Sequence, residues 1–250
     1  MTSVLEAKEL HKQYDLGEHP VIALGGVNFQ VEPGEFVAIM GPSGSGKSTL
    51  LHLLGGLDTP TSGLVNLAGK PLTGISDNEA TLARRHNIGF IFQFFNLVPT
   101  LDAEENILLP VIIDGKNPAE FSDRLDTLLE LVGLQQRRHH RPDQLSGGEQ
   151  QRVAIARALI TRPAVILADE PIGNLDSKSG KVIMELLRRS CDEMNQSIVE
   201  VTHDARAAAY ADRVVFLRDG QIEQEIRIET NQPFSQRLRT IIDVLEKLEL

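Results

Sequence analysis

Apolar and polar residues follow one another in patterns that predict several short β-strands. Residues 27–31 alternate between the two kinds, which is typical of a strand with one buried face. Residues 36–40 and 164–168 are apolar throughout, which indicates strands that are covered on both faces. Residues 88–92 and 197–202 predict two further strands. Strands covered on both faces are typical of a parallel sheet in an α/β protein.

Helical spacing dominates other parts of the chain. A Leu-rich segment at residues 49–57 predicts a helix directly after a glycine-rich loop. Residues 94–141 are mainly helical in pattern, and one helix there begins at Asn117, with Pro118 in its first turn and Glu120 three residues after the cap. We interpret this stretch as a helical lobe inserted into the α/β core. Shorter helices are predicted at residues 181–189 and 205–211.

The two ends of the chain predict smaller elements. Residues 4–31 look like short strands joined by turns, and residues 59–75 like turns around one short strand. Residues 213–217 and 221–228 predict a hairpin across an Asp-Gly turn. The tail places an apolar stripe on one helical face, formed by Leu238, Ile241, Ile242, Leu245 and Leu248. This stripe packs on its own domain, pairs with a second copy or meets a regulator.

Composition excludes several classes of protein. With 25 basic and 35 acidic residues, the 250-residue chain has a formal charge of −10, which argues against a nucleic-acid partner. The one cysteine, Cys191, excludes a disulfide framework. No uncharged apolar run approaches the roughly 18 residues of a membrane span, and Glu6 and Glu9 argue against a secretory signal. We therefore expect a cytoplasmic protein whose membrane span, if it needs one, belongs to another chain.

A phosphate-binding loop follows the first buried strand. The pattern G-x-x-x-x-G-K-[ST] is matched without exception by Gly41, Pro42, Ser43, Gly44, Ser45, Gly46, Lys47 and Ser48, and Thr49 follows. Glycines let backbone N–H groups surround phosphate oxygens, and the next helix directs its N-terminus at the same charge. Lys47 is expected to reach the β- and γ-phosphates and Ser48 to ligate Mg²⁺. The loop therefore predicts a nucleotide as the ligand, held by its phosphates.

Two carboxylates come directly after the second buried strand. Asp169 stands at the end of the strand, where it is expected to hold Mg²⁺ beside the phosphate loop. Glu170 points elsewhere and is expected to polarise the attacking water as a general base.

A second anion site is predicted at the start of an apolar-periodic helix. The segment runs Leu145-Ser146-Gly147-Gly148-Glu149, and it joins a serine hydroxyl, two glycine N–H groups and a helix N-terminus. Two phosphate sites in one chain suggest that two subunits share one nucleotide.

With these motifs the chain resembles the ATP-binding subunits of ABC transporters over about residues 3–225. The resemblance implies a P-loop NTPase core with an antiparallel β subdomain and an inserted helical subdomain. Core residues are about 1–93 and 160–225, the lobe about 94–159, and residues 226–250 form an extension of strand and helix. The family dimer is head to tail, and its signature motif, here residues 145–149, contacts the γ-phosphate on the partner's P-loop.

Further site residues are implied by the same resemblance. Gln93 matches the Q-loop glutamine, which senses Mg²⁺ and the γ-phosphate, and His203 matches the switch histidine that steadies the γ-phosphate and the water. Asp176 lies in the D-loop, and Tyr14 is placed where the family stacks an aromatic ring on adenine. Ile172 departs from the usual Thr or Ser, which removes a hydroxyl near the dimer interface.

The residues around Gln93 are similar to the macrolide-exporter and lipoprotein-release group, with FtsE-type cell-division ATPases as relatives. Members of that group work as homodimers beneath a permease that has a large extracytoplasmic domain. Phe94 and Phe95 are expected to form the groove for the coupling helix of that partner, whereas Phe90 and Phe92 are expected in the core. The resemblance implies an ATPase that drives export or release from the inner face of the membrane. The alternative is a regulatory ATPase that controls an extracytoplasmic activity without transport.

Overall fold

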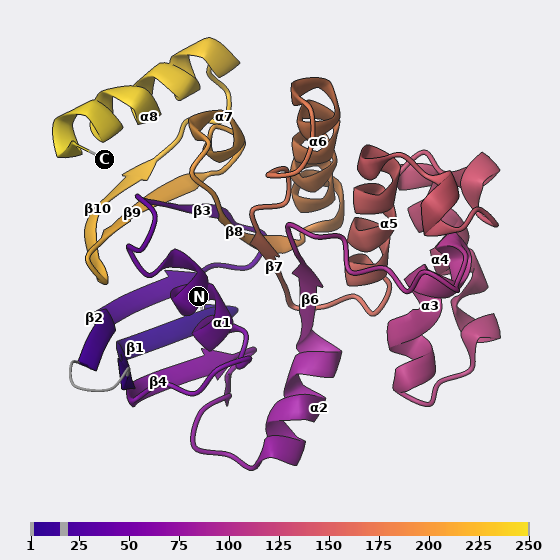
Figure 1. The fold of residues 1–250 in the computed structure, drawn as a ribbon, viewed down its shortest axis with the longest axis horizontal. Coiled ribbons are helices and arrows are strands. Elements are labelled where there is room, and N and C mark those ends of the chain that lie inside the picture. The colour runs from indigo at the N-terminus through magenta and orange to yellow at the C-terminus, as the bar shows by residue number, and fades with distance from the viewer. Residues whose placement is uncertain (1–2, 16–19, 250) are drawn as a thin grey trace.

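Two β-sheets form the framework of the computed structural model, which describes residues 3–15 and 20–249 (Figure 1). The larger sheet has the order β10-β9-β3-β8-β7-β6. Its strands are β3 (Phe36–Met40), β6 (Ile88–Ile91), β7 (Val165–Asp169), β8 (Ser197–Val201), β9 (Arg213–Arg218) and β10 (Gln221–Arg227). All pairings are parallel except the β9–β10 hairpin, which confirms the predicted hairpin and the predicted α/β sheet.

The smaller sheet is antiparallel and has the order β2-β1-β4-β5. It consists of β1 (Leu5–Asp15), β2 (Pro20–Val31), β4 (Ser62–Leu67) and β5 (Lys70–Pro71). The sequence analysis predicted short strands for residues 4–31, which is wrong. Irregular pairing interrupts the alternation, because the register of β1 shifts between Ala7 and Leu10, directly before His11, and again directly after Lys12.

Strand β3 is apolar throughout because two separate cores cover its faces. Val37 and Ile39 face a core shared with the antiparallel sheet and with α1 (Lys47–Leu54). Ala38 and Met40 face the other core, beneath α6 (Ser177–Met194) and α7 (Ala205–Ala208). Strand β3 therefore contributes side chains to both cores.

Three helices lie together, well apart from the antiparallel sheet in Figure 1. They are α3 (Ala103–Ile113), α4 (Ser122–Leu131) and α5 (Gly147–Leu159), with 3₁₀ turns at Pro118–Phe121, Gln135–Arg137 and Pro142–Gln144. Asn117 does cap a helix start, but the turn that follows is 3₁₀ and α4 begins only at Ser122. The boundaries of this helical lobe, about 94–159, stay a prediction.

One helix was missed by the sequence analysis, α2 (Asp77–Asn87). Ser76 and Glu79 form a reciprocal capping box at its start, a pattern visible in the sequence. The helix has no fully buried residue, so it lacks the apolar stripe on which helix prediction depends.

The chain ends in α8 (Phe234–Leu248), which packs on its own domain. Ile241 is fully buried, the Phe234 ring lies 5.2 Å from that of Tyr210, and Arg237 donates a hydrogen bond to the carbonyl of Ala209. Ile242, predicted to lie on the apolar stripe, is instead exposed. Across the described ranges, 3–15 and 20–249, no helix combines the length and the apolar character needed to cross a membrane.

Candidate functional site

The predicted phosphate loop connects β3 with α1. Gly46 is the N-cap of α1 and has φ +99°, a left-handed conformation that favours glycine. A Cβ atom at Gly46 would lie 2.4 Å from the carbonyl oxygen of Ala23, so the loop is also pressed against β2. The hairpin supports it from another side, because the N–H of Gly220 donates to the carbonyl of Ser45 at 3.0 Å.

Lys47 is the buried cation of this loop. Its ammonium group donates to the carbonyl oxygens of Gly41 at 2.9 Å and Pro42 at 2.8 Å, and the residue is only 8% exposed. Burial lowers the pKa of Lys47, while the carboxylates of Glu170 and Asp169 act in the opposite direction. The loop therefore carries a poorly hydrated positive charge, which an anion can reach by replacing two carbonyl partners.

Asp169 ends β7 beside α1. The Ser48 hydroxyl donates to the Asp169 carboxylate at 3.2 Å, and the His52 imidazole lies 4.0 Å from its other oxygen. Burial raises the pKa of Asp169, and the contacts with Ser48 and His52 act in the opposite direction, as expected for a carboxylate whose lost hydration is only partly compensated. A hydroxyl and an under-compensated carboxylate are the donor types that Mg²⁺ accepts from proteins, so these two residues fit that ion.

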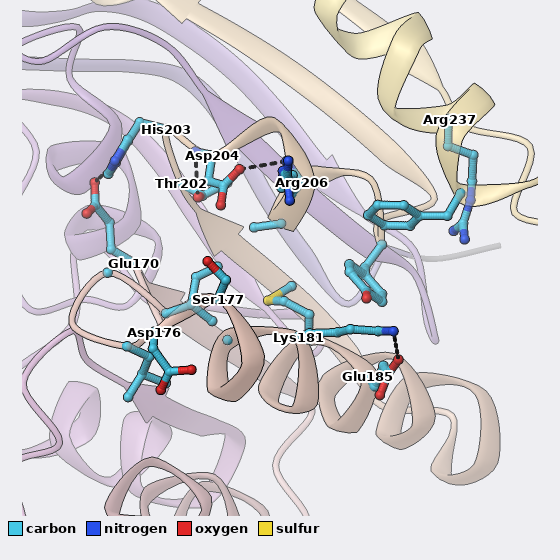
Figure 2. Close-up of a pocket in the computed structure, with 18 residues that line it drawn as sticks. Glu170, Asp176, Ser177, Lys181, Glu185, Thr202, His203, Asp204, Arg206 and Arg237 are labelled. Atoms are coloured by element: carbon cyan, nitrogen blue, oxygen red, sulfur yellow. Dashed lines mark hydrogen bonds and ion pairs between the residues drawn. The ribbon is translucent and has the colours of Figure 1, made fainter. Parts of the chain in front are cut away.

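Glu170 and His203 meet at the ends of β7 and β8, as Figure 2 shows. The distance between the Glu170 carboxylate and Nδ1 of His203 is 2.9 Å. Glu170 has φ +45°, a conformation that is rare outside glycine, and its N–H donates to the carbonyl of Val201. Strained backbone of this kind is stored mainly at functional sites. The turn separates the direction of Glu170 from that of Asp169, as the sequence analysis expected.

Gln93 lies against the segment that follows Glu170. The side chain of Asn174 donates to the carbonyl of Gln93 at 3.0 Å, and the two amide groups approach to 3.5 Å. A Cβ at Gly173 would lie 2.9 Å from Nε2 of Gln93 and 3.2 Å from Glu170. The structure therefore brings Gln93 and Glu170 together around Gly173.

Tyr14 is held by Asp58, which follows α1 in the sequence. Its hydroxyl donates to Asp58 at 2.8 Å, and burial, followed by this contact, raises the pKa of Tyr14. The Lys12 ammonium also binds Asp58 and lies 4.7 Å from the centre of the Tyr14 ring. One ring face is therefore covered by a cation.

The second predicted anion site is on another part of the molecule. Ser146 caps α5, and Gly147 and Gly148 form its first turn. Their nearest neighbours come from the Gly173–Ser179 region: Leu175 for Gly147 and Ser179 for Gly148. Asp176 caps α6 by accepting the N–H groups of Lys178 and Ser179. α1 and α5 lie well apart in Figure 1, so the two predicted anion sites belong to different parts of the molecule.

The comparison with protein families identifies this fold. The model described as ABC transporter matches residues 24–173. The chain belongs to the ABC transporter family. It is 52% identical over 223 residues to an ABC transporter ATP-binding protein of Thermotoga maritima, covering 89% of this chain and 95% of that one.

Two further relatives refine this assignment. The macrolide export ATP-binding/permease protein MacB of Bdellovibrio bacteriovorus is 46% identical over 227 residues, which are 90% of this chain and 34% of MacB. The solved dimer of the ATP-binding cassette MJ0796 from Methanocaldococcus jannaschii, bound to ADP and Pi, has a TM-score of 0.81 and 45% identity. It covers 89% of this chain, which spans 98% of that cassette.

These findings confirm the resemblance to ABC transporter ATP-binding subunits of the macrolide-exporter and lipoprotein-release group, and they confirm the fold class. The chain is the ATP-binding subunit of an ABC transporter and an ATPase.

Sequence reasoning did not predict two contacts that support the site. Asp58, which holds Tyr14, and Asn174, which holds Gln93, act through contacts 44 and 81 residues apart. No local pattern predicts contacts at such separations, so only the folded chain reveals them.

Proposed function

We propose that two copies of this subunit enclose two ATP molecules head to tail, and that hydrolysis of ATP reopens the dimer. The observation that carries this proposal is the Glu170–His203 pair at 2.9 Å beside the Lys47 loop, in a chain that also has a separate serine-glycine cap at Ser146. Each nucleotide would then contact the P-loop of one copy and the cap of the other. ATP favours closure because both half-sites bind its charge, and the work done equals the difference in affinity between the two states.

The P-loop half-site holds the phosphates. Gly41, Pro42, Ser43, Gly44, Ser45 and Gly46 surround them with backbone, Lys47 pairs with the β- and γ-phosphates, and Ser48 and Thr49 begin the helix beneath them. Ser48, Asp169 and Gln93 would hold Mg²⁺, which supplies neutralisation of phosphate charge when bound.

Glu170 acts as the general base for the attacking water, and His203 positions the same carboxylate and contacts the γ-phosphate. Their contact keeps Glu170 turned toward the end of β8. Gln93 couples nucleotide binding to the helical lobe, because it lies in the segment that joins β6 to α3.

Tyr14 stacks on adenine with the ring face that Lys12 leaves free. Ser146, Gly147 and Gly148 bind the γ-phosphate held by the partner's P-loop. Asp176 orders the D-loop next to them by capping α6.

A membrane permease with a large extracytoplasmic domain is the proposed partner, bound from the cytoplasmic face. Phe94 supports this assignment, since its ring follows β6 and is 70% exposed. Phe95 is half-buried beside it, next to Gly147. An exposed aromatic ring between the core and the helical lobe is suited to receive a helix of the partner.

The proposal is tested with Glu170→Gln. Removing the carboxylate is expected to lower ATP turnover by at least about 100-fold, in line with the loss of a general base, while ATP still forms a stable dimer. Phosphate release and sedimentation velocity measure the two properties. Turnover that persists at the wild-type rate would contradict the role of Glu170.

Lys47→Ala is the matched control. It removes the cation of the P-loop and is expected to weaken nucleotide binding itself, so that no ATP-dependent dimer forms. A mild-detergent pull-down from native membranes then tests the partner. Recovery of a permease with a large extracytoplasmic domain supports the transport role, whereas a purely soluble partner contradicts it.

A further inference from the structure

The Ser146 hydroxyl is occupied by a neighbour on its own helix. It donates to the Glu149 carboxylate at 2.8 Å, and it accepts the N–H of Glu149 at 3.3 Å. The same carboxylate oxygen also accepts the N–H of Ser146 at 2.8 Å. Both the donor and the acceptor of this exposed serine are therefore satisfied within one turn.

A serine hydroxyl has a single proton to donate. An anion that approaches the cap must take this proton from Glu149, because two acceptors cannot share it at full strength. The bond to be replaced is charge-assisted, and such bonds are about twice as strong as neutral ones. The hydrogen bonds from Ser146 lower the pKa of Glu149, so the carboxylate keeps its charge at neutral pH.

The guanidinium group of Arg137 lies close to this carboxylate. Nε of Arg137 lies 3.5 Å from the second oxygen of Glu149, and Arg137 belongs to the 3₁₀ turn before the signature segment. Arg152, on the same helix, adds a more distant positive charge. Arg137 is half exposed, so its side chain can follow Glu149 when the serine releases it.

We propose that Glu149 is a positioning residue that holds the hydroxyl proton of Ser146 until the partner's ATP displaces it, with Arg137 stabilising the released carboxylate. This inference rests on the proposed function, since it assigns Ser146 to the γ-phosphate across the dimer. Glu149 then sets the ATP concentration at which the dimer closes, separately from the affinity of the P-loop for ATP.

The test uses Glu149→Gln and Arg137→Gln, each in the Glu170→Gln background that prevents turnover. Sedimentation velocity gives the ATP concentration for half-maximal dimer formation. Glutamine keeps an acceptor for the cap but loses the charge, so this concentration is expected to fall about fivefold. Arg137→Gln is expected to raise it about twofold, the size of one exposed charge pair. The double variant is expected to match Glu149→Gln alone.

Nucleotide binding to the monomer separates this role from a structural one. Neither variant is expected to change the affinity of the monomer for fluorescent ATP analogues, which reports the P-loop only. Glu149→Ala serves as the capping control, because it removes the acceptor for the Ser146 N–H and is expected to lower the thermal midpoint.

Half-maximal closure at an equal or higher ATP concentration in Glu149→Gln would overturn the inference. Additive effects of the two substitutions would overturn the part assigned to Arg137. A Glu170→Gln parent that never dimerises with ATP would instead contradict the proposed function, and with it this inference.

Discussion

The P-loop is pressed against the backbone of a distant strand, whereas the glycines of the signature segment meet distant residues only through their side chains. A Cβ at Gly46 would lie 2.4 Å from a backbone oxygen of β2, but one at Gly147 would lie 3.4 Å from a leucine side chain. The first distance is a clash and the second an ordinary contact. The P-loop therefore depends on the complete fold. The signature segment keeps its shape through local hydrogen bonds and can exchange its hydrogen-bond partners.

The largest expected effect tests this contrast with two alanine substitutions. Gly46→Ala forces a side chain into left-handed backbone and onto β2, and is expected to abolish ATP binding and to destabilise the fold by about 3 kcal/mol or more. Gly147→Ala is expected to leave ATP binding by the P-loop of the monomer, and the free energy of unfolding, within about 0.5 kcal/mol of wild type. Calorimetric titration and urea unfolding measure both quantities. Wild-type ATP affinity in Gly46→Ala would contradict the proposed difference between the P-loop and the signature segment.

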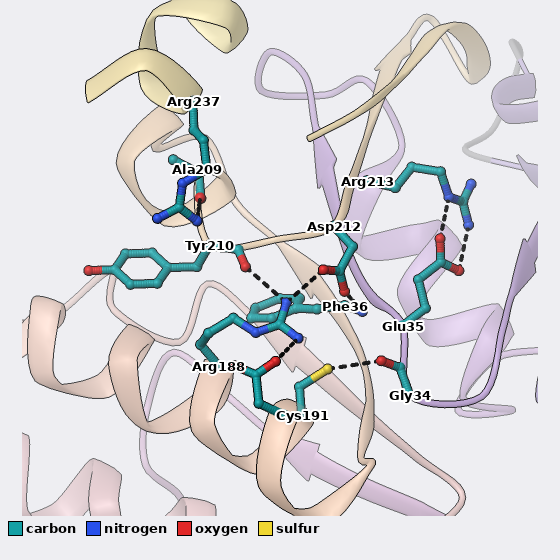
Figure 3. A network of polar contacts seen from close by, with 11 residues as sticks. Gly34, Glu35, Phe36, Arg188, Cys191, Ala209, Tyr210, Asp212, Arg213 and Arg237 are labelled. Carbon is teal, nitrogen blue, oxygen red and sulfur yellow. Dashed lines mark hydrogen bonds and ion pairs between the residues drawn. The ribbon is translucent and has the colours of Figure 1, made fainter. Parts of the chain in front are cut away.

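The second test compares a buried ion pair of the core with a more exposed ion pair of the helical lobe. Figure 3 shows Arg213 bound to Glu35, and both side chains are 8% exposed. Arg213→Leu leaves a buried carboxylate without its partner and is expected to cost about 3–5 kcal/mol in urea unfolding.

Arg138 of the helical lobe pairs with Glu104 and Asp126, but its side chain is more exposed. Arg138→Leu is therefore expected to cost no more than about 1 kcal/mol. Equal losses in the two variants would show that the core and the lobe are stabilised alike.

The last test is a pH dependence and concerns two buried polar side chains. Asn106 of the lobe is fully buried and makes four hydrogen bonds, three to carbonyl oxygens and one from the N–H of Val98. Glu200 on β8 is equally buried, yet neither carboxylate oxygen has a partner among residues 3–15 and 20–249. Burial, with a contribution from Asp204, raises the pKa of Glu200 to about 8.

A raised carboxyl pKa makes the folded state bind its proton more tightly than the unfolded state does. The stability from Glu200 is therefore complete below its ordinary value of 4.5 and is lost as the pH rises toward about 8. Relative to Glu200→Leu, the wild type is expected to lose about 1.4 kcal/mol per pH unit in this window. Urea unfolding at pH 5, 6, 7 and 8 gives the slope, and Asn106→Leu supplies a control without it. Parallel pH profiles for the wild type and Glu200→Leu would contradict the assignment.

Local patterns predicted the parts of the fold in which neighbours in sequence are neighbours in space. The apolar run of β3, the P-loop and the Ser146 cap are all of this kind. The left-handed backbone of Glu170 could not be predicted, because it depends on the hydrogen bond from its N–H to Val201.

Glu200 shows the same limit in the core. It interrupts an apolar strand, which favours an exposed position, but Ala38 and Ala168 lie opposite it on the two neighbouring strands. Their small side chains leave room for a carboxyl group. Such an arrangement depends on which strands pair, and that information is not local.

Cys191 is the only cysteine of the chain, and its thiol donates to the carbonyl of Gly34 from a buried position (Figure 3). Burial raises the pKa of this thiol to about 12, so almost no thiolate is present at neutral pH. Maleimide reagents are therefore expected to leave Cys191 unmodified and to react with a cysteine introduced on the surface. Spin labels or fluorophores can therefore be attached selectively to an introduced cysteine without removing Cys191. Distances between labels on two copies can then follow closure of the proposed dimer.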